Sequence, residues 1–120
     1  MKIAIPVDNE SMEANVSVSF GRSTYFLIYE TDNQKFEYFK NEAANSQGGA
    51  GIKAAQFLVD ANIDILLTPR CGENAANVFS ETNIKLYQTR GTSIPYNLNA
   101  YLGGELMQLK EIGASLKHVG

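Results

Sequence analysis

The sequence predicts an α/β fold in which a five-stranded mixed sheet lies between helices on both faces. Two observations predict it: a strand-like segment and a hairpin-like pair open the chain, and helical and strand-like apolar spacings then alternate. If the hairpin lies beside the first strand, a right-handed crossover through the first helix places the fourth strand on the other side of the first. The strand order is then 3-2-1-4-5, with only the second strand antiparallel.

The first part of the chain predicts three strands. Lys2 to Val7 alternates partly between polar and apolar residues and is typical of a strand. Residues 9–22 then form a loop that is long for a compact domain, and such loops are usually functional or mobile. The aromatic segments Tyr25 to Glu30 and Phe36 to Phe39, separated by the turn residues 31–34, predict a β-hairpin.

The second part of the chain predicts alternating helices and strands. Apolar residues at helical spacing indicate the helices, and short apolar runs between them indicate strands, the first of them buried on both faces. In chain order the predicted elements are a helix over about 51–61, a strand over 63–67, a helix over 73–80, a strand over 84–87 and a helix capped by Ser93 that ends at Gly103-Gly104.

The tail from Glu105 to Gly120 predicts a short final helix. Leu106, Leu109 and Ile112 have helical spacing, and Gly113 then breaks the pattern. The chain has no internal repeat, low-complexity segment or Pro-rich linker, so we expect a single domain over residues 1–120.

Composition and charge narrow the class of protein. The 120 residues are 44% hydrophobic and 19% charged, which fits a globular chain with one core. The net charge is -3 and the pI is near 5.1, so the protein lacks a broad basic surface. We therefore expect no nucleic-acid or membrane partner. No run is long enough for a signal peptide or a membrane span, and the single cysteine agrees with a reducing compartment. We therefore expect a cytoplasmic protein.

Three short stretches at joints between predicted elements form the candidate site. They are Ser19-Phe20-Gly21-Arg22, Gly48-Gly49-Ala50-Gly51, and Arg70-Cys71-Gly72-Glu73-Asn74-Ala75. In the predicted topology all three lie beyond the carboxyl ends of strands, beside the switch point between the first and fourth strands, where α/β proteins commonly bind ligands.

Two predicted helix N-termini point into this crevice, at residues 49–52 and 72–75. Their unpaired N–H groups favour an anion, and Arg22, Arg70 and Arg90 are placed to add positive charge. The alternative interpretation is that the glycines only allow a tight loop and close packing of helix and sheet. The glycine-rich stretch is not a Walker loop, so no nucleotide is expected.

Cys71 is the candidate metal ligand. It follows Arg70 and precedes a predicted helix N-terminus, and both would lower the pKa of the thiol and favour the thiolate. The alternative is a small buried core residue. A single thiolate cannot complete a zinc site, whereas a cluster that brings its own ligands needs fewer protein atoms. His118, near the end of the chain, is not counted as a ligand.

Several motifs together resemble the dinitrogenase iron-molybdenum cofactor-binding family over about residues 1–104, with 105–120 as a C-terminal extension. They are the opening Met-Lys-Ile-Ala-Ile-Pro-Val-Asp, Phe20-Gly21-Arg22 before an aromatic strand, Gly49-Ala50-Gly51-Ile52 at the start of a helix, and Cys71-Gly72-Glu73-Asn74-Ala75. The resemblance implies a three-layer α/β/α ribonuclease H-like domain. It also implies members that carry or help assemble the nitrogenase cofactor or related metal–sulfur clusters.

This chain departs from the family pattern at two positions. Many members have a histidine immediately before Phe-Gly-Arg, where this chain has Ser19, and many have a proline where it has Glu73. The missing histidine removes an obvious metal ligand, and Cys71 is then the best remaining ligand candidate.

The first functional hypothesis is a non-enzymatic carrier of an anionic iron-molybdenum or other metal–sulfur cluster, a nitrogenase accessory factor-like protein with cluster-assembly proteins as partners. Soft thiolate ligation by Cys71 suits that chemistry. The expected cofactor-binding residues are Ser19, Phe20, Gly21, Arg22, Gly49, Gly51, Gly72 and Asn74.

Two alternatives stay open. One is a protein-interaction module that has kept the fold and lost the cluster, which Ser19 favours. The other is a two-metal nuclease, which needs several converging carboxylates. Asp8 and Glu73 are the only carboxylates expected near the crevice, because Asp60 and Asp64 flank the opposite edge of the sheet.

Overall fold

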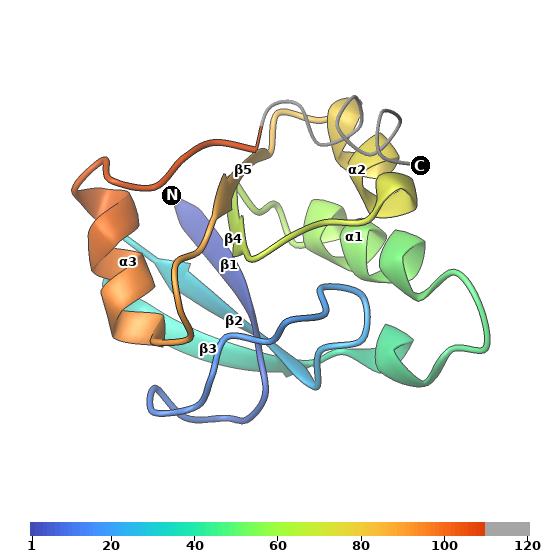
Figure 1. Cartoon of the computed structure of the whole chain (residues 1–120), viewed down its shortest axis with the longest axis horizontal. Helices are drawn as coiled ribbons and strands as arrows, with labels where there is room; N and C mark the ends of the chain where they lie inside the picture. The colour runs from blue at the N-terminus through green and yellow to red at the C-terminus, as the bar shows by residue number, and fades with distance from the viewer. Residues whose placement is uncertain (110–120) are drawn as a thin grey trace.

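The computed structural model describes residues 1–109 of the chain (Figure 1). Its strands and helices follow the predicted order closely. They are β1 (Lys2–Val7), β2 (Tyr25–Glu30), β3 (Lys35–Lys40), the 3-10 helix η1 (Glu42–Asn45), α1 (Ala50–Asp60), β4 (Ile65–Thr68), α2 (Glu73–Ser80), β5 (Lys85–Gln88) and α3 (Ile94–Leu102).

The five strands form one sheet in the order β3-β2-β1-β4-β5. β1 pairs antiparallel with β2 along its whole length, from Lys2 opposite Glu30 to Val7 opposite Tyr25. β2 pairs antiparallel with β3, whereas β4 runs parallel to both β1 and β5. The predicted order, with β2 as the one antiparallel strand of the sheet, is therefore confirmed.

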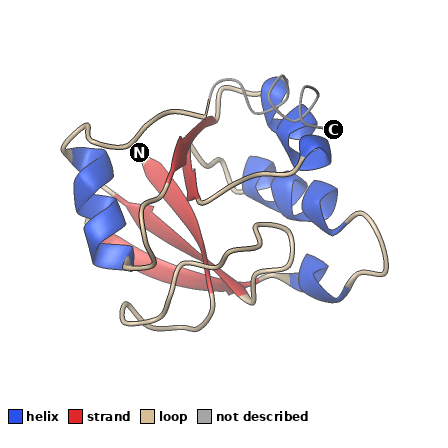
Figure 2. Cartoon of the chain, in the orientation of Figure 1, coloured by secondary structure: helices blue, strands red, loops and turns tan. Residues whose placement is uncertain are grey.

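Helices cover both faces of the sheet, with α1 and α2 on one side and α3 on the other (Figures 1 and 2). Alternation along β1 explains this arrangement, because successive side chains of a strand point to opposite faces. Ala4 belongs to the core under α1 and α2, whereas its neighbours Ile3 and Ile5 belong to the core under α3. The molecule thus has the three-layer α/β/α architecture that the resemblance implies.

The predicted strand over 63–67 begins two residues later in the structure. The Ile63 N–H donates to the Leu58 carbonyl at 3.3 Å, so this residue closes the end of α1. Asn62 supports the turn with a φ of 61°. Asp64 then makes the first contact with β1, since its N–H donates to the Lys2 carbonyl at 2.9 Å.

The prediction of a short helix in the tail 105–120 is wrong for its described part, residues 105–109. These residues are not helical, and Gln108 forms a bridge with Tyr87 at the outer edge of β5. There the Gln88 N–H donates to the Met107 carbonyl at 2.8 Å and the Leu109 N–H donates to the Leu86 carbonyl at 2.7 Å. The segment covers strand-edge groups that would otherwise lack partners, and it buries Leu106 in the core under α3. Residues 110–120, including Ile112, Gly113 and His118, lie outside the described residues.

Sequence reasoning missed η1, the single turn that follows β3. Asn41 caps it, because the Asn41 side chain accepts a hydrogen bond from the Ala43 N–H. Among residues 1–109, no helix is long and apolar enough to cross a membrane.

Candidate anion-binding cleft

Apart from Gly48, the three predicted stretches line one open cleft of about 620 Å³ at the carboxyl edge of the sheet. Its walls come from the loop before β2, the start of α1 and the link between β4 and α2. The lining residues are 18–22, 49–52 and 70–75, so all nine residues predicted for the site are among them. The prediction that distant stretches meet at this edge is confirmed, while their roles toward a ligand stay predictions.

The long loop before β2 is held in place by backbone hydrogen bonds. Val16 donates to the Thr92 carbonyl at 2.9 Å, and Ser17 donates to the Pro6 carbonyl at 2.8 Å. These bonds fix the loop to β1 and to the start of α3, just before it reaches the cleft.

Both helices that begin at the cleft lack a side-chain cap. Gly49 is the N-cap of α1 and Gly72 is the N-cap of α2, and neither has a side chain that can accept a hydrogen bond. By contrast, Ser93 caps α3 and Asn41 caps η1 with their side chains. The first turns of α1 and α2 therefore present N–H groups, and the positive ends of their dipoles, to the cleft.

The intrahelical hydrogen bonds define which N–H groups these are. In α1 the Lys53 N–H is bonded to the Gly49 carbonyl at 3.0 Å, and in α2 the Ala76 N–H is bonded to the Gly72 carbonyl at 2.9 Å. The three preceding N–H groups of each helix have no intrahelical acceptor. Those six groups belong to residues 50–52 and 73–75, all of which line the cleft.

Gly21 and Gly51 come from different stretches and touch through their backbones. A Cβ on Gly21 would lie 2.9 Å from both the Cα and the N of Gly51. Only glycine at position 21 allows this approach, so the loop before β2 rests directly on the first turn of α1. Gly49 is needed for another reason, because its φ of 71° is in the left-handed region.

Phe20 and Ser19 shape the floor and one wall of the cleft. Phe20 is buried, and its ring centroid lies 5.5 Å from that of Phe26 and 5.7 Å from that of Phe79. Ser19 occupies the position where many family members have a histidine, and its Oγ accepts a hydrogen bond from the Arg22 N–H at 3.3 Å. Ser19 therefore closes the local turn.

The expectation of a lowered thiol pKa at Cys71 is wrong. The residue is only 5% exposed and packs in the core under α1 and α2, and this burial raises the pKa of the thiol to about 12. Desolvation of the thiolate outweighs both the helix N-terminus and the neighbouring, exposed Arg70. Cys71 lines the cleft as a neutral thiol.

The three arginines predicted to add charge have different positions. Arg22 lines the cleft, but its Nη1 donates to the carbonyls of Ala44 at 2.9 Å and Ser46 at 3.0 Å, so it also ties the loop before β2 to η1. Arg70 is exposed and lines the cleft. Arg90 does not line it, and instead donates from Nη2 to the Glu105 carbonyl at 2.6 Å.

The described residues contain no metal site built from three or more ligating side chains. Within residues 1–109, no three His, Cys, Asp or Glu residues converge as metal ligands. Asp8 is not part of the cleft lining, and Glu73 is its only carboxylate. A two-metal nuclease would need several carboxylates that converge here.

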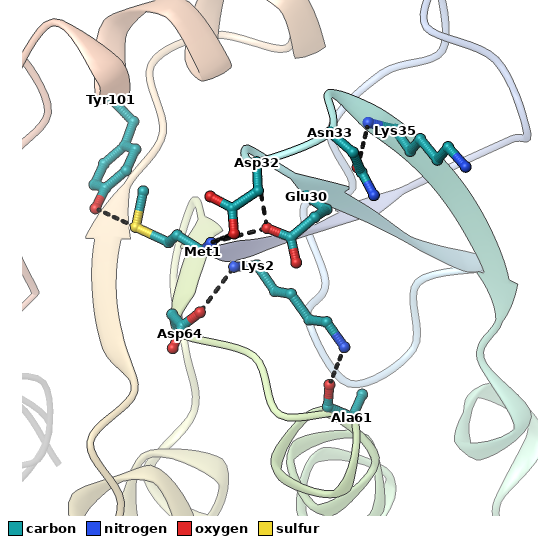
Figure 3. A network of polar contacts seen from close by, with 9 residues as sticks. All are labelled: Met1, Lys2, Glu30, Asp32, Asn33, Lys35, Ala61, Asp64 and Tyr101. Atoms are coloured by element: carbon teal, nitrogen blue, oxygen red, sulfur yellow. Dashed lines mark hydrogen bonds and ion pairs between the residues drawn. The ribbon is translucent and has the colours of Figure 1, made fainter.

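The opposite edge of the sheet carries a network of charged and polar groups (Figure 3). The Met1 ammonium donates to Glu30 Oε2 at 2.8 Å, which holds the pKa of the ammonium above its usual range and that of the Glu30 carboxyl below it. The Lys2 N–H donates to Asp64 Oδ2 at 2.8 Å. Asp64 therefore lies where the sequence placed it, far from the cleft along the strands.

Sequence reasoning missed Val18 and Asn41 near the cleft, and it gave the side chain of Ile52 no place there. Val18 and Ile52 are 69% and 44% exposed and line its rim as apolar side chains. Asn41 lies behind the cleft, and its Nδ2 donates to the carbonyls of Gly21 at 3.0 Å and Ser23 at 2.9 Å. An asparagine directly after a strand is a typical N-cap, and that pattern is the signal that would have found it.

Comparisons with known proteins agree with this architecture. The sequence matches the family model described as dinitrogenase iron-molybdenum cofactor over residues 1–104. The apo form of the orange protein from Desulfovibrio gigas is 26% identical, with a TM-score of 0.85 and alignment over 91% of this chain and 92% of that chain. A Thermotoga protein described as NifB-like is 30% identical, with a TM-score of 0.79 over 90% of this chain and 92% of that chain.

A more divergent structure shares the fold. A dinitrogenase-like protein from Methanocaldococcus jannaschii is 24% identical, with a TM-score of 0.70 over 92% of this chain and 95% of that chain. No curated protein sequence matches the chain. Because the family model spans residues 1–104, the chain belongs to the dinitrogenase iron-molybdenum cofactor family.

Proposed function

We propose that the cleft binds an anionic metal–sulfur cluster, and that the chain carries this cluster without catalysing a reaction on it. The observation that carries the proposal is the convergence of two uncapped helix N-termini on one open cleft. Family membership supports the nature of the anion, since the family is described by the iron-molybdenum cofactor of dinitrogenase. In this proposal the cluster is cargo, exchanged with cluster-assembly proteins in the cytoplasm.

The donor set of the cleft fits such an anion. Sulfide ligands of a cluster accept hydrogen bonds from N–H groups, and helix dipoles favour negative charge at the same place. The cleft volume of about 620 Å³ is within the usual range for ligand sites. A cluster that brings its own ligands also agrees with the lack of a three-residue metal site within residues 1–109.

The charged residues at the cleft act in opposite directions. Arg70 is exposed and favours an anion, whereas Glu73 is the first residue of α2 and repels one. The apolar rim residues Val18 and Ile52 place hydrocarbon beside the cleft, and a lower local dielectric constant strengthens hydrogen bonds to a bound anion.

Cys71 ligation is a separate part of the proposal. With a thiol pKa of about 12, binding of a metal to the sulfur releases a proton that the folded protein holds tightly. We therefore infer that the amide donors provide the main attraction, and that Cys71 adds a metal–sulfur bond only after its thiol loses the proton. A Cys71→Ser variant separates the two contributions, because it leaves the amide donors in place.

Anaerobic reconstitution tests the proposal. The wild type is incubated with iron, sulfide and molybdate and desalted, and its metal content and visible absorption are then measured. We expect stoichiometric metal and a charge-transfer band. Arg70→Gln should retain less metal, whereas Lys85→Gln, which loses the same charge at the opposite edge of the sheet, should match the wild type. A wild type without metal would contradict the proposal.

The second candidate is an interaction module that has lost the cluster. The exposed apolar side chains of Val18 and Ile52 at the rim favour it, as does Ser19 in the position of the family's histidine. The same reconstitution separates the two functions, because an interaction module retains no metal under conditions in which a carrier is loaded.

A further inference from the structure

One buried side chain connects the end of β3, the loop before β2 and η1 behind the cleft. Asn41 is 4% exposed and follows β3 directly. Its Nδ2 donates to the carbonyls of Gly21 and Ser23, at 3.0 and 2.9 Å, and its Oδ1 accepts from the Ala43 N–H at 3.2 Å. The side chain thus uses both donors and its acceptor to join the loop before β2 to η1.

This connection continues to the N–H groups of α1. The Gly21 carbonyl is held by Asn41, and the Gly21 Cα is so close to Gly51 that a Cβ there would lie 2.9 Å from its backbone. If Gly21 moves, it must therefore either separate from α1 or carry the first turn of α1 with it. That first turn carries half of the uncapped N–H groups of the cleft.

Arg22 provides a second tie between the same segments. Its Nη1 donates to the carbonyls of Ala44 and Ser46, and Lys53 Nζ in α1 donates to Ser46 Oγ at 3.3 Å. Arg22 and Lys53 are exposed, so these bonds are weaker constraints than the buried amide of Asn41.

We propose that Asn41 is a positioning residue of the cleft: it fixes Gly21 against the first turn of α1 and so sets the place of the N–H donors that face the ligand. Its effect on cargo rests on the proposed function, whereas its effect on Gly51 does not. By analogy with residues that orient metal ligands, we expect substitution of Asn41 to change ligand affinity about 10- to 100-fold.

The chain offers a matched control for the test. Asn97 is 0% exposed and makes the same set of bonds, since its Nδ2 donates to the carbonyls of Arg90 and Ser93 and its Oδ1 accepts from the Arg90 N–H. It lies in α3, on the other face of the sheet, and does not line the cleft. Asn41→Asp and Asn97→Asp each replace two buried donors with an oxygen that faces two carbonyls.

The experiment compares the two variants with the wild type in two measurements. One is the ¹H–¹⁵N correlation spectrum of the ligand-free protein, and the other is metal retention and affinity after reconstitution with iron, sulfide and molybdate. We expect Asn41→Asp to shift the amide resonances of Gly21, Gly51 and Ile52 and to weaken cluster binding about 10- to 100-fold. Asn97→Asp should leave these resonances and the affinity as in the wild type.

Two results would overturn the inference: unshifted Gly51 and Ile52 resonances in Asn41→Asp, or equal weakening of binding by Asn97→Asp. If Asn41→Asp does not fold, Asn41→Ser replaces it, because serine still caps the Ala43 N–H but lacks the two-donor amide. If the wild type binds no cluster, the proposed function fails, and the Gly51 and Ile52 resonances alone decide the positioning role.

Discussion

The two edges of the sheet differ in how their polar groups are paired. At the edge where β1 and β4 begin, charged and polar groups bind one another. At the edge where these strands end, the first turns of α1 and α2 have no side-chain caps. At the first edge the Met1 ammonium donates to Glu30 and the Lys2 backbone N–H donates to Asp64 (Figure 3). At the second edge glycines occupy both N-caps. We interpret the first edge as serving stability and propose that the second serves a ligand, because uncapped N–H groups are donors still available to bind.

The largest predicted effect is on the reactivity of Cys71, a cleft residue whose side chain is buried. A pKa of about 12, against 9.0 for an ordinary thiol, leaves about a thousandfold less thiolate near neutral pH. We expect iodoacetamide at pH 8 to alkylate the native protein about a thousandfold more slowly than the unfolded chain. Comparable rates in the two states would show that the thiol is accessible and ionised.

The same thiol gives a pH dependence of stability with a defined sign. Its pKa is raised in the folded state, so its contribution to the free energy of unfolding is complete below about pH 9 and is lost as the pH rises toward 12. Denaturant titrations of the wild type and Cys71→Ala across this range should therefore converge as the pH rises. A constant difference between the two proteins would contradict the buried neutral thiol.

An intermediate effect is expected where the cleft depends on close backbone packing. Gly21→Ala places a methyl group 2.9 Å from the Gly51 backbone, so we expect the free energy of unfolding to fall by about 1–3 kcal/mol. Gly48→Ala is the matched control, because a Cβ at that position meets nothing within 4 Å. Urea denaturation of both variants measures the effect, and equal stabilities would show that the loop does not rest on α1.

The smallest effect is expected at the opposite edge. Asp64→Asn removes the charge from the acceptor of the Lys2 N–H, at an exposed position, so the free energy of unfolding should fall by less than about 1 kcal/mol. Metal retention after reconstitution should be unchanged, because the residue lies outside the cleft. A loss of metal in Asp64→Asn would show that the two edges are not independent.

The sheet order could be predicted from the sequence because it depends on a local hairpin signal and on the handedness of the crossover connection. The two aromatic segments on either side of residues 31–34 indicate a hairpin. A right-handed crossover then places β4 beside β1, on the side away from β2. α2 and α3 have the predicted bounds, since the glycine before Glu73 and the capping Ser93 define their starts. The meeting of the three stretches at one edge follows from that topology.

The remaining features depend on tertiary packing that spacing does not reveal. Leu106 and Leu109 are compatible with a helix as well as a strand. The segment is not helical because it forms backbone hydrogen bonds with the open edge of β5. Local charge at Cys71 predicted a lower pKa, but burial raised it. The role of Arg22 in tying the loop before β2 to η1 requires contacts between residues more than twenty positions apart, and no local pattern indicates them.

Capping α2 tests most directly whether uncapped N–H groups bind the cargo. Gly72 has N-cap geometry, with φ of -67° and ψ of 162°, and a Cβ there meets nothing within 4 Å. Gly72→Asp should therefore raise the free energy of unfolding by about 0.3–1 kcal/mol through capping and the helix dipole. Gly48→Asp adds the same charge without a cap and is the control.

Both variants and the wild type would be reconstituted with iron, sulfide and molybdate, and their retained metal would be measured beside their stability. We expect Gly72→Asp to be more stable than the wild type and to retain little metal, whereas Gly48→Asp retains clearly more metal than Gly72→Asp. Full metal retention in a stabilised Gly72→Asp would contradict the claim that the N–H groups of α2 hold the cluster.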